Sequence, residues 1–262
     1  MAVKANGLAS RYTRAAYPIR PRTIARSVGE VGAGKTRWWL NAPGPIVVQS
    51  FDKGLEGVIE EFQDGKEIYP IEYDWRPVVG TTSEQEAQTL RAQFEEDYRF
   101  ALKHARTVVW DKETSVWQLY RYAEFGGPSD KPKDYDALNL RYMNLINEAK
   151  EVDVNFALIQ GMKDKWGTKK VTNQQGQQKE QPFQTDDREA AGFRRLDELV
   201  FMEINHRCEL TDEGPRWTLE LGKCRQNKSM QYQSYDVTEG SGLSFAEFGQ
   251  LLIEGSEQGD WE

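Results

Sequence analysis

Short apolar runs alternate with longer amphipathic segments along the first two thirds of the chain. The apolar runs are rich in β-branched residues and are bounded by turn residues, as buried strands are. They fall at residues 23–28, 46–50, 107–110 and 156–159. Apolar side chains recur at helical spacing in residues 84–105 and 135–150, each time directly before an apolar run. This alternation predicts an α/β fold with a mostly parallel central sheet and crossover helices.

The later part of the chain follows a less regular pattern. Residues 193–202 predict a short helix that leads into a strand. Residues 217–221 and 232–237 predict late antiparallel strands around the turn at Gly214-Pro215. Residues 161–190 are rich in Lys, Gln, Gly, Thr and Asp and contain few apolar side chains, so we expect a long mobile loop there.

We expect one main domain at residues 21–240, because a chain of 262 residues can bury a single large α/β core. Residues 1–20 carry several Arg and Tyr side chains without sustained periodicity and are interpreted as an N-terminal arm. Residues 241–262 form a short C-terminal segment. Its acidic, Gly-rich tail after Glu254 is predicted to be disordered.

The composition is that of an ordinary globular protein, with 38% hydrophobic residues, 29% charged residues and a formal net charge of -8. No apolar run approaches a membrane span, the first residues lack the apolar core of a secretory signal, and Cys208 and Cys224 form no paired motif. We therefore expect no membrane contact and a reducing cytoplasm, that of the host if the chain is phage-encoded. The acidic balance argues against a broadly basic nucleic-acid coat, but local basic loops can still bind phosphates.

Residues 29–36 read Gly-Glu-Val-Gly-Ala-Gly-Lys-Thr, a complete G-x-x-x-x-G-K-[ST] phosphate-binding loop between a predicted strand and a predicted helix. The glycines let backbone N–H groups turn toward phosphate, Lys35 brings a positive charge to the terminal phosphates, and Thr36 offers a hydroxyl to Mg²⁺. This motif predicts a nucleotide triphosphatase. The expected nucleotide contacts are Gly29, Glu30, Val31, Gly32, Ala33, Gly34, Lys35, Thr36 and Arg37.

Three carboxylates close to predicted strand ends are candidates for organising Mg²⁺ and water. Asp111 ends an apolar strand, at the place where an α/β sheet holds a magnesium-organising aspartate beside the phosphate loop. Asp52 ends the second strand and is the first candidate for orienting the attacking water. Glu113 is its rival, because a carboxylate shortly after the magnesium aspartate can also reach the γ-phosphate side.

Gln160 follows the strand at residues 156–159 and precedes the polar loop. Its side chain could sense the γ-phosphate and pass this signal to the loop, or it could simply cap backbone groups at the strand end. The loop itself combines positive charge with an aromatic ring, a composition suited to single-stranded nucleic acid, the alternative being a solvated loop. The candidate DNA contacts are Lys163, Lys165, Trp166, Lys169 and Lys170.

A second basic cluster follows the predicted strand at residues 217–221. Lys223 and Arg225 could contact the nucleotide of a neighbouring subunit, in trans, or they could be ordinary surface charges. His104 and His206 have no partners at the spacing of a metal site or a catalytic triad, so we expect no catalytic role for them.

Taken in order, these motifs resemble the RecA-like ATPase core, and most closely the small phage-encoded RecA-fold ATPases linked to single-strand annealing and recombination. The resemblance runs over residues 23–237. It rests on the phosphate loop, on residues 46–52 followed by Lys-Gly-Leu, on Val-Val-Trp-Asp at 108–111, on 158–163 and on 223–225. It implies a three-layer P-loop NTPase with ATP and Mg²⁺ as ligands.

The resemblance also implies roles for single residues. Asp52 takes the place of the carboxylate that activates water, although it is an aspartate where the family more often has glutamate. Gln160 matches the glutamine before the second DNA-binding loop, and Lys223 and Arg225 match basic residues that contact ATP across a subunit interface. The chain departs from the family at Lys112, where a small residue is usual, and it lacks the large N-terminal helical domain and the long C-terminal domain.

These features together predict an Mg²⁺-dependent ATPase that assembles head to tail on single-stranded DNA during recombination or repair. A single-strand-binding or other recombination protein is a further expected partner, and residues 12–15 loosely match a tether between subunits. Two alternatives stay open. One is a helicase-like or packaging motor built as a closed ring, and the other is a regulatory protein that binds ATP with little turnover.

Overall fold

The computed structural model describes residues 20–62, 65–75, 83–127, 135–172 and 178–262. The expected arm, with the tether motif at residues 12–15, therefore lies almost entirely outside the described residues. Among the helices of the described residues, none has both the length and the hydrophobicity needed to cross a bilayer.

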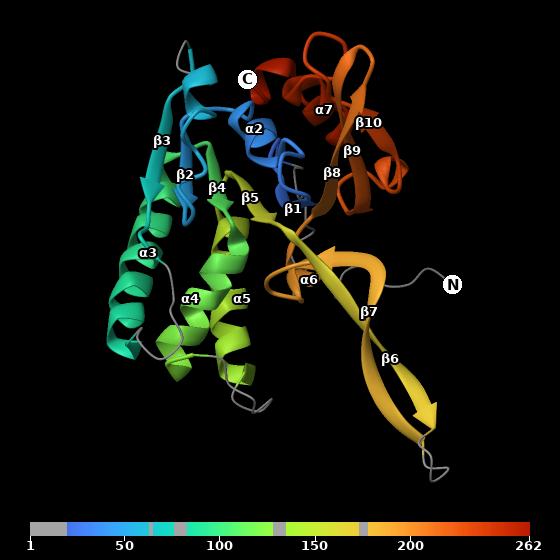
Figure 1. Ribbon diagram of the computed structural model, residues 1–262. Coiled ribbons are helices and arrows are strands. Elements are labelled where there is room, and N and C mark those ends of the chain that lie inside the picture. The colour runs from blue at the N-terminus through green and yellow to red at the C-terminus, as the bar shows by residue number, and fades with distance from the viewer. Residues whose placement is uncertain (1–19, 63–64, 76–82, 128–134, 173–177) are drawn as a thin grey trace, which may run out of the picture.

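An eight-stranded sheet runs through the middle of the molecule (Figure 1). Its strands in chain order are β1 (Ile24–Gly29), β2 (Ile46–Ser50), β3 (Ile68–Glu72), β4 (Thr107–Asp111), β5 (Asn155–Gln160), β8 (Met202–Thr211), β9 (Gly214–Cys224) and β10 (Ser234–Asp236). The spatial order is β3-β2-β4-β5-β1-β8-β9-β10. All pairs from β3 to β8 are parallel, whereas β9 runs antiparallel to both its neighbours. The predicted α/β class, with late antiparallel strands, is confirmed.

Helices cover both faces of the sheet and give a three-layer architecture (Figure 1). The helices are α2 (Lys35–Leu40), α3 (Glu84–His104), α4 (Glu113–Phe125), α5 (Tyr135–Glu151), α6 (Leu196–Leu199) and α7 (Phe245–Leu252). Single 3-10 turns occur at η1 (Ile59–Phe62), η3 (Lys228–Met230) and η4 (Gln258–Asp260). Helices α3, α4 and α5 bury their apolar stripes against one face, and α2 and α7 cover the other. Each face therefore has its own hydrophobic core.

Helix α3 shows how local sequence positions these layers. Ser83 and Glu86 form a capping box, which satisfies backbone N–H groups that the first helical turn leaves unpaired. Phe94 and Tyr98 then stand one turn apart and pack on Trp110 of β4, with ring centroids 5.1 and 4.9 Å away. The helix predicted at residues 84–105 is thus held by its cap at one end and by aromatic packing along its length.

The segment predicted as a mobile loop is instead a long antiparallel hairpin, made of β6 (Met162–Thr172) and β7 (Gln178–Ala190). It leaves the sheet directly after β5 and projects away from the body of the molecule (Figure 1). The prediction was wrong because polar side chains were read as a sign of irregular backbone. A ribbon that projects into solvent has little apolar surface to bury, so the usual alternation of a half-buried strand is absent.

The predicted disorder after Glu254 is also wrong. Turn η4 leads the chain back onto α7, and Trp261 is almost fully buried in the core between α2 and α7. Its indole lies against Gly249, where an added Cβ would stand 2.2 Å from a ring carbon. The burial of Trp261, together with a hydrogen bond from Arg106 Nη2 to the Asp260 carbonyl at 2.9 Å, thus holds the acidic tail against the body of the molecule.

We expect Gly249→Ala to destabilise the protein by about 1–3 kcal/mol, because the new methyl group would overlap the indole of Trp261. Alanine should gain up to about 1 kcal/mol in a helix relative to glycine, so a net loss has to come from this overlap. Gly259→Ala is the matched control, since nothing lies within 4 Å of the added Cβ. Urea unfolding measures both variants, and equal stability would contradict the docked tail.

Candidate nucleotide site

The phosphate loop connects β1 to α2 at the carboxyl edge of the sheet, as predicted. Gly32 and Gly34 have φ angles of 82° and 76°, a left-handed backbone that strains other residues. Gly29 is confined differently, because a Cβ there would lie 2.6 Å from the backbone oxygen of His206 on β8. The three glycines are thus required by the backbone, and Val31 at the tip of the loop is fully exposed.

The Lys35 ammonium lies folded back onto its own loop. Its Nζ donates to the carbonyl of Gly29 at 2.9 Å and to the carbonyl of Glu30 at 2.6 Å. Burial lowers the pKa of Lys35, while Asp111 and Glu30 oppose this shift. The ammonium group is therefore held over the loop by two carbonyl oxygens, and the oxygens of a bound phosphate could take their place as acceptors.

Thr36 and Asp111 meet at the same edge. The Thr36 hydroxyl donates to Asp111 Oδ1 at 3.2 Å, and Asp111, the last residue of β4, is 7% exposed. Burial, reinforced by the charge of Asp52, raises the pKa of Asp111 to about 6. A cation would remove this unfavourable burial of negative charge, so the pair suits one.

The donor set fits magnesium bound together with a nucleotide. Within the described ranges, no three His, Cys, Asp or Glu side chains cluster as they would around a metal held by protein alone. Mg²⁺ commonly takes only one or two protein oxygen ligands and completes its shell with phosphate and water. Thr36 and Asp111 supply this minimal set of hard oxygen donors.

Asp52 lies next to this pair, on the turn after β2. Its Oδ1 accepts from the backbone N–H of Gly54 at 3.0 Å and from Ser50 at 3.4 Å, and Lys112 Nζ is 3.5 Å from Oδ2. Its charge reaches Asp111, whose pKa it raises. Position and proximity keep Asp52 a candidate for orienting water, with Lys112 as a local counter-ion.

Glu113, the rival candidate, lies in a different environment. It is fully buried, with Oε1 accepting from the Tyr142 hydroxyl at 2.6 Å and Oε2 accepting from Gln160 Nε2 at 2.5 Å and from the backbone N–H of Phe193 at 3.3 Å. Burial raises the pKa of Glu113 to about 7, against the lowering effect of these hydrogen bonds. A carboxylate that is enclosed and fully engaged in this way cannot orient an attacking water.

Gln160 is buried in the same network. Its Oε1 accepts from Arg26 Nε at 2.7 Å, and Arg26 forms an ion pair with Glu203 at 2.8 Å. A continuous polar chain therefore runs from β8 through β1 and β5 to α4. The amide of Gln160 is thus engaged by the side chains of Arg26 and Glu113, and not by the backbone groups that the strand-end alternative assigned to it.

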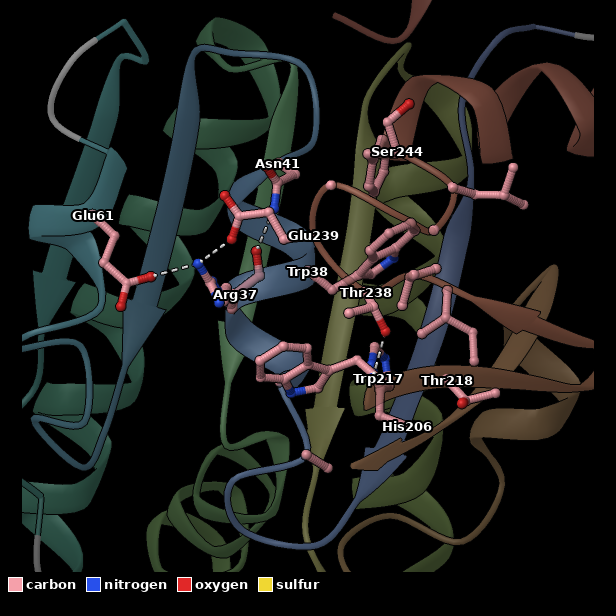
Figure 2. Close-up of a pocket in the computed structure, with 18 of the residues that line it drawn as sticks. Arg37, Trp38, Asn41, Glu61, His206, Trp217, Thr218, Thr238, Glu239 and Ser244 are labelled. Carbon is pink, nitrogen blue, oxygen red and sulfur yellow. Dashed lines mark hydrogen bonds and ion pairs between the residues drawn. The ribbon is translucent and has the colours of Figure 1, made fainter. Parts of the chain in front are cut away.

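A cavity of about 250 Å³ opens beside the phosphate loop, between α2 and the loop that follows β10 (Figure 2). Its walls include Trp38, Trp217, Thr238 and Phe245. The indole of Trp217 lies against the loop itself, because a Cβ on Gly34 would stand 2.9 Å from its Cδ1 atom. The cavity adjoins the phosphate loop at Ala33 and Gly34, so the ribose and base of a bound nucleotide could enter it.

Arg37 is one of the residues that line this cavity. Its guanidinium pairs with Glu61 at 3.1 Å and with Glu239 at 2.7 Å, and Figure 2 shows the two carboxylates approaching it from opposite sides. The group also stands 5.7 Å from the ring centroid of Trp217. Sequence reasoning proposed Arg37 but missed Glu61, Trp217 and Glu239, which belong to no motif and come from segments far apart in the chain.

His206, for which the sequence predicts no catalytic role, lies buried below the loop. Its Nε2 lies 3.1 Å from the Ser27 hydroxyl, which also accepts from Trp39 Nε1 at 2.7 Å. Burial, with a smaller effect of Lys35, lowers the pKa of His206 to about 3. A neutral imidazole thus joins β8, β1 and α2 beneath the phosphate loop.

The candidate DNA residues lie on the β6–β7 hairpin. Lys163 and Lys165 are exposed, but they face Glu189 at 3.1 Å and Asp187 at 3.6 Å on the opposite strand. Trp166, Lys169 and Lys170 have a described backbone in β6, and their side chains lie outside the described structure. Residues 162–190 hold six basic and five acidic side chains, so the hairpin is close to charge balance.

Lys223 and Arg225 lie at the opposite edge of the sheet from the phosphate loop, because Cys224 pairs with Met202 at the start of β8. Lys223 Nζ donates to the carbonyl of Asp197, and Arg225 Nη2 donates to the carbonyl of Glu198 at 3.3 Å. Neither can reach the nucleotide loop of its own chain. Contact with the nucleotide of a neighbouring subunit therefore stays a prediction for these two residues.

No protein-family model matches the chain, and no curated protein matches it. Among solved structures, the chain is similar to a KaiC-like protein from the hyperthermophilic archaeon Pyrococcus horikoshii OT3. The two share 10% identity, the alignment covers 83% of this chain and 85% of that one, and the TM-score is 0.47. A likeness at this identity concerns the fold and says nothing of single residues.

We expect Glu113→Gln to fold and Glu113→Ala to lose about 3 kcal/mol or more of stability. The glutamine carbonyl can accept from Gln160 and Phe193 while its amide donates to Tyr142, whereas alanine leaves buried donors unpaired. Denaturant unfolding at a fixed pH measures both. Equal losses in the two variants would contradict the network.

The same carboxyl predicts a pH dependence. Folded Glu113 keeps its proton up to about pH 7, whereas the unfolded chain releases it near the ordinary value of 4.5. The free energy of unfolding should therefore fall as pH rises through this interval. Glutamine does not titrate, so the Glu113→Gln variant should lose less stability than the wild type between about pH 5 and about pH 8. Parallel pH profiles would contradict the raised pKa.

Proposed function

We propose that this protein is an Mg²⁺-dependent ATPase that acts on single-stranded DNA as a self-associating assembly. The observation that carries the nucleotide part is the meeting of Lys35, Thr36 and Asp111 at one sheet edge, beside an open cavity. A charged amine, a hydroxyl and a buried carboxylate are the groups that phosphoryl transfer uses for positioning and charge stabilisation.

In this proposal the triphosphate lies along the phosphate loop, and its base and ribose enter the cavity next to Trp217. Mg²⁺, held by Thr36 and Asp111, would neutralise phosphate charge. Lys35 would leave the carbonyls of Gly29 and Glu30 for the terminal phosphates. Asp52 would orient a water whose oxygen forms a bond to the γ-phosphorus, while the bond from that phosphorus to the β–γ bridging oxygen breaks. ADP leaves with the bridging oxygen, and a proton of the water passes to the released phosphate or to solvent.

The DNA part rests on the hairpin, which projects from the body beside the nucleotide site (Figure 1). Exposed Lys163 and Lys165 support contact with a phosphate backbone, and the near balance of charges on the hairpin argues for a weak, salt-sensitive contact. Self-association is supported by Lys223 and Arg225, whose place at the far edge suits the nucleotide of a neighbouring copy. A helicase-like ring would use the same parts.

A regulatory protein that binds ATP with little turnover is the second candidate. The observation in its favour is Asp52, a short acid whose carboxylate is already engaged by Gly54 and faces Lys112. Both oxygens of this acid already have partners, which leaves it less capacity to accept a hydrogen bond from an attacking water. Comparing affinity with turnover separates the two candidates, because tight binding with negligible hydrolysis fits only the second.

We expect Lys35→Ala to lower ATP affinity and to reduce turnover by about 100-fold or more, because it removes a charge-assisted contact to the phosphates. Binding is measured with a fluorescent ATP analogue, and turnover by phosphate release with and without Mg²⁺. Lys66→Ala serves as the control, because Lys66 is bonded to the carbonyls of Asn41 and Ala42, away from the phosphate loop. Unchanged affinity in Lys35→Ala would count against this site.

We expect turnover per subunit to rise with protein concentration and with added single-stranded DNA. Lys223→Ala with Arg225→Ala should remove the concentration dependence, and Lys163→Ala with Lys165→Ala should weaken the DNA effect. Phosphate release is measured with no nucleic acid, with single-stranded DNA, with duplex DNA and with RNA, at two salt concentrations. A flat rate under all conditions would contradict both DNA coupling and contacts in trans.

A further inference from the structure

One ion pair joins the hairpin to the phosphate loop. Arg188 of β7 places its Nη1 atom 3.0 Å from Oε1 of Glu30, the second residue of the loop. Lys163 and Lys165, by contrast, pair within the hairpin. Among the described side chains of the hairpin, Arg188 thus links it to the place where phosphate is expected.

Arg188 is held in this position by both strands at the base of the hairpin. Its Nη2 atom donates to the carbonyl of Met162 at 3.0 Å, and Asp164 lies 3.8 Å from its Nε atom. The side chain stays 44% exposed. It is therefore oriented toward the loop and still accessible to a ligand from solvent.

Glu30 is an unusual neighbour for a triphosphate. Its carbonyl accepts from Lys35 at 2.6 Å, so the residue lies at the point where terminal phosphates would arrive, and its side chain is 54% exposed. A carboxylate there repels an incoming polyanion. Arg188 neutralises that charge in the absence of ligand, and the fully exposed Val31 beside it leaves the approach open.

We propose that Arg188 is a further nucleotide-binding residue, which exchanges Glu30 for the terminal phosphate when a triphosphate binds. The inference rests on the proposed nucleotide site. A guanidinium binds phosphate through two parallel hydrogen bonds, and a terminal phosphate carries more negative charge than one carboxylate. A diphosphate offers no group at the terminal position, so Arg188 stays on Glu30.

Through this exchange the nucleotide would contact the hairpin directly, because Arg188 belongs to β7. Glu113 fixes the two ends of the hairpin from inside, through Gln160 before β6 and Phe193 after β7. Arg188 fixes the base of β7 from outside, through the loop. Moving the outer contact from Glu30 to a phosphate would reposition the hairpin about its inner anchor. Such a signal needs no direct contact between Gln160 and the nucleotide.

The test is a double-mutant cycle with Arg188→Ala and Glu30→Gln, read as affinity for a non-hydrolysable ATP analogue and for ADP. We expect Arg188→Ala to lower the affinity for the ATP analogue about tenfold and to leave the affinity for ADP unchanged. Glu30→Gln should bind the ATP analogue more tightly, since the competing carboxylate is gone. Arg188→Ala should lower the affinity for the ATP analogue at least as much in the Glu30→Gln background as in the wild type.

If the ion pair is purely structural, Arg188→Ala should not change the affinity for the ATP analogue once Glu30 is replaced, and that result would overturn the proposal. Equal losses of affinity for the ATP analogue and for ADP would overturn it too. Arg194→Ala is the matched control, because this exposed arginine near the hairpin lies 4.0 Å from Glu189; we expect both affinities to stay unchanged. If the wild type binds ATP and Arg188→Ala binds it equally well, only this inference fails. If the wild type binds neither nucleotide, the proposed function fails too.

Discussion

The buried carboxyl of Glu113 is the contact on which the arrangement of the site depends. It lies two residues after Asp111 and accepts hydrogen bonds from α5, from the end of β5 and from the chain that returns from the hairpin. Gly192 passes so close that a Cβ would stand 2.1 Å from the carboxyl oxygen. The strand that carries Asp111 and both ends of the hairpin are thus fixed to one group.

The phosphate loop has a comparable constraint from the other face of the sheet. Ser27, Trp39 and His206 form a small buried network under the loop, and the backbone of β8 leaves no room for a side chain at Gly29. The loop is therefore held from below, while its tip at Val31 is open to solvent. A rigid base with an open tip suits a ligand that must enter and leave.

Much of the parallel sheet follows from local sequence. The apolar run at residues 46–50 coincides with β2, and the phosphate loop lies between strand and helix as its glycines require. Edge strand β3 was not predicted, since it contains Pro70 and is half exposed, so it carries little of the hydrophobic pattern of a buried strand. The hydrophobic pattern of a short sequence segment indicates which residues are buried, so it gives little signal for a strand that is largely exposed.

The long-range parts of the site could not be predicted for a related reason. The hairpin pairs residues as far apart in the chain as Met162 and Ala190, and the cavity is bounded by Arg37, Glu61 and Glu239. Such contacts leave no periodic trace along the chain. The burial of Glu113 could not be predicted either, because its neighbours in the sequence are polar, and Glu113 therefore stood as the rival of Asp52 for orienting water.

The charge distribution argues that nucleotide and hairpin act on one another. Residues 162–190 hold nearly equal numbers of basic and acidic side chains, and Lys163 and Lys165 pair with acids on the opposite strand, which leaves little net charge for steering a polyanion. The pair between Arg188 and Glu30 instead connects the hairpin to the loop, so a change of charge at the loop alters the force on the hairpin. If Arg188 exchanges Glu30 for a phosphate as proposed, then by linkage a partner that moves the hairpin also changes the affinity for the nucleotide. The hairpin is thus better suited to communicate with the phosphate loop than to attract DNA by charge alone.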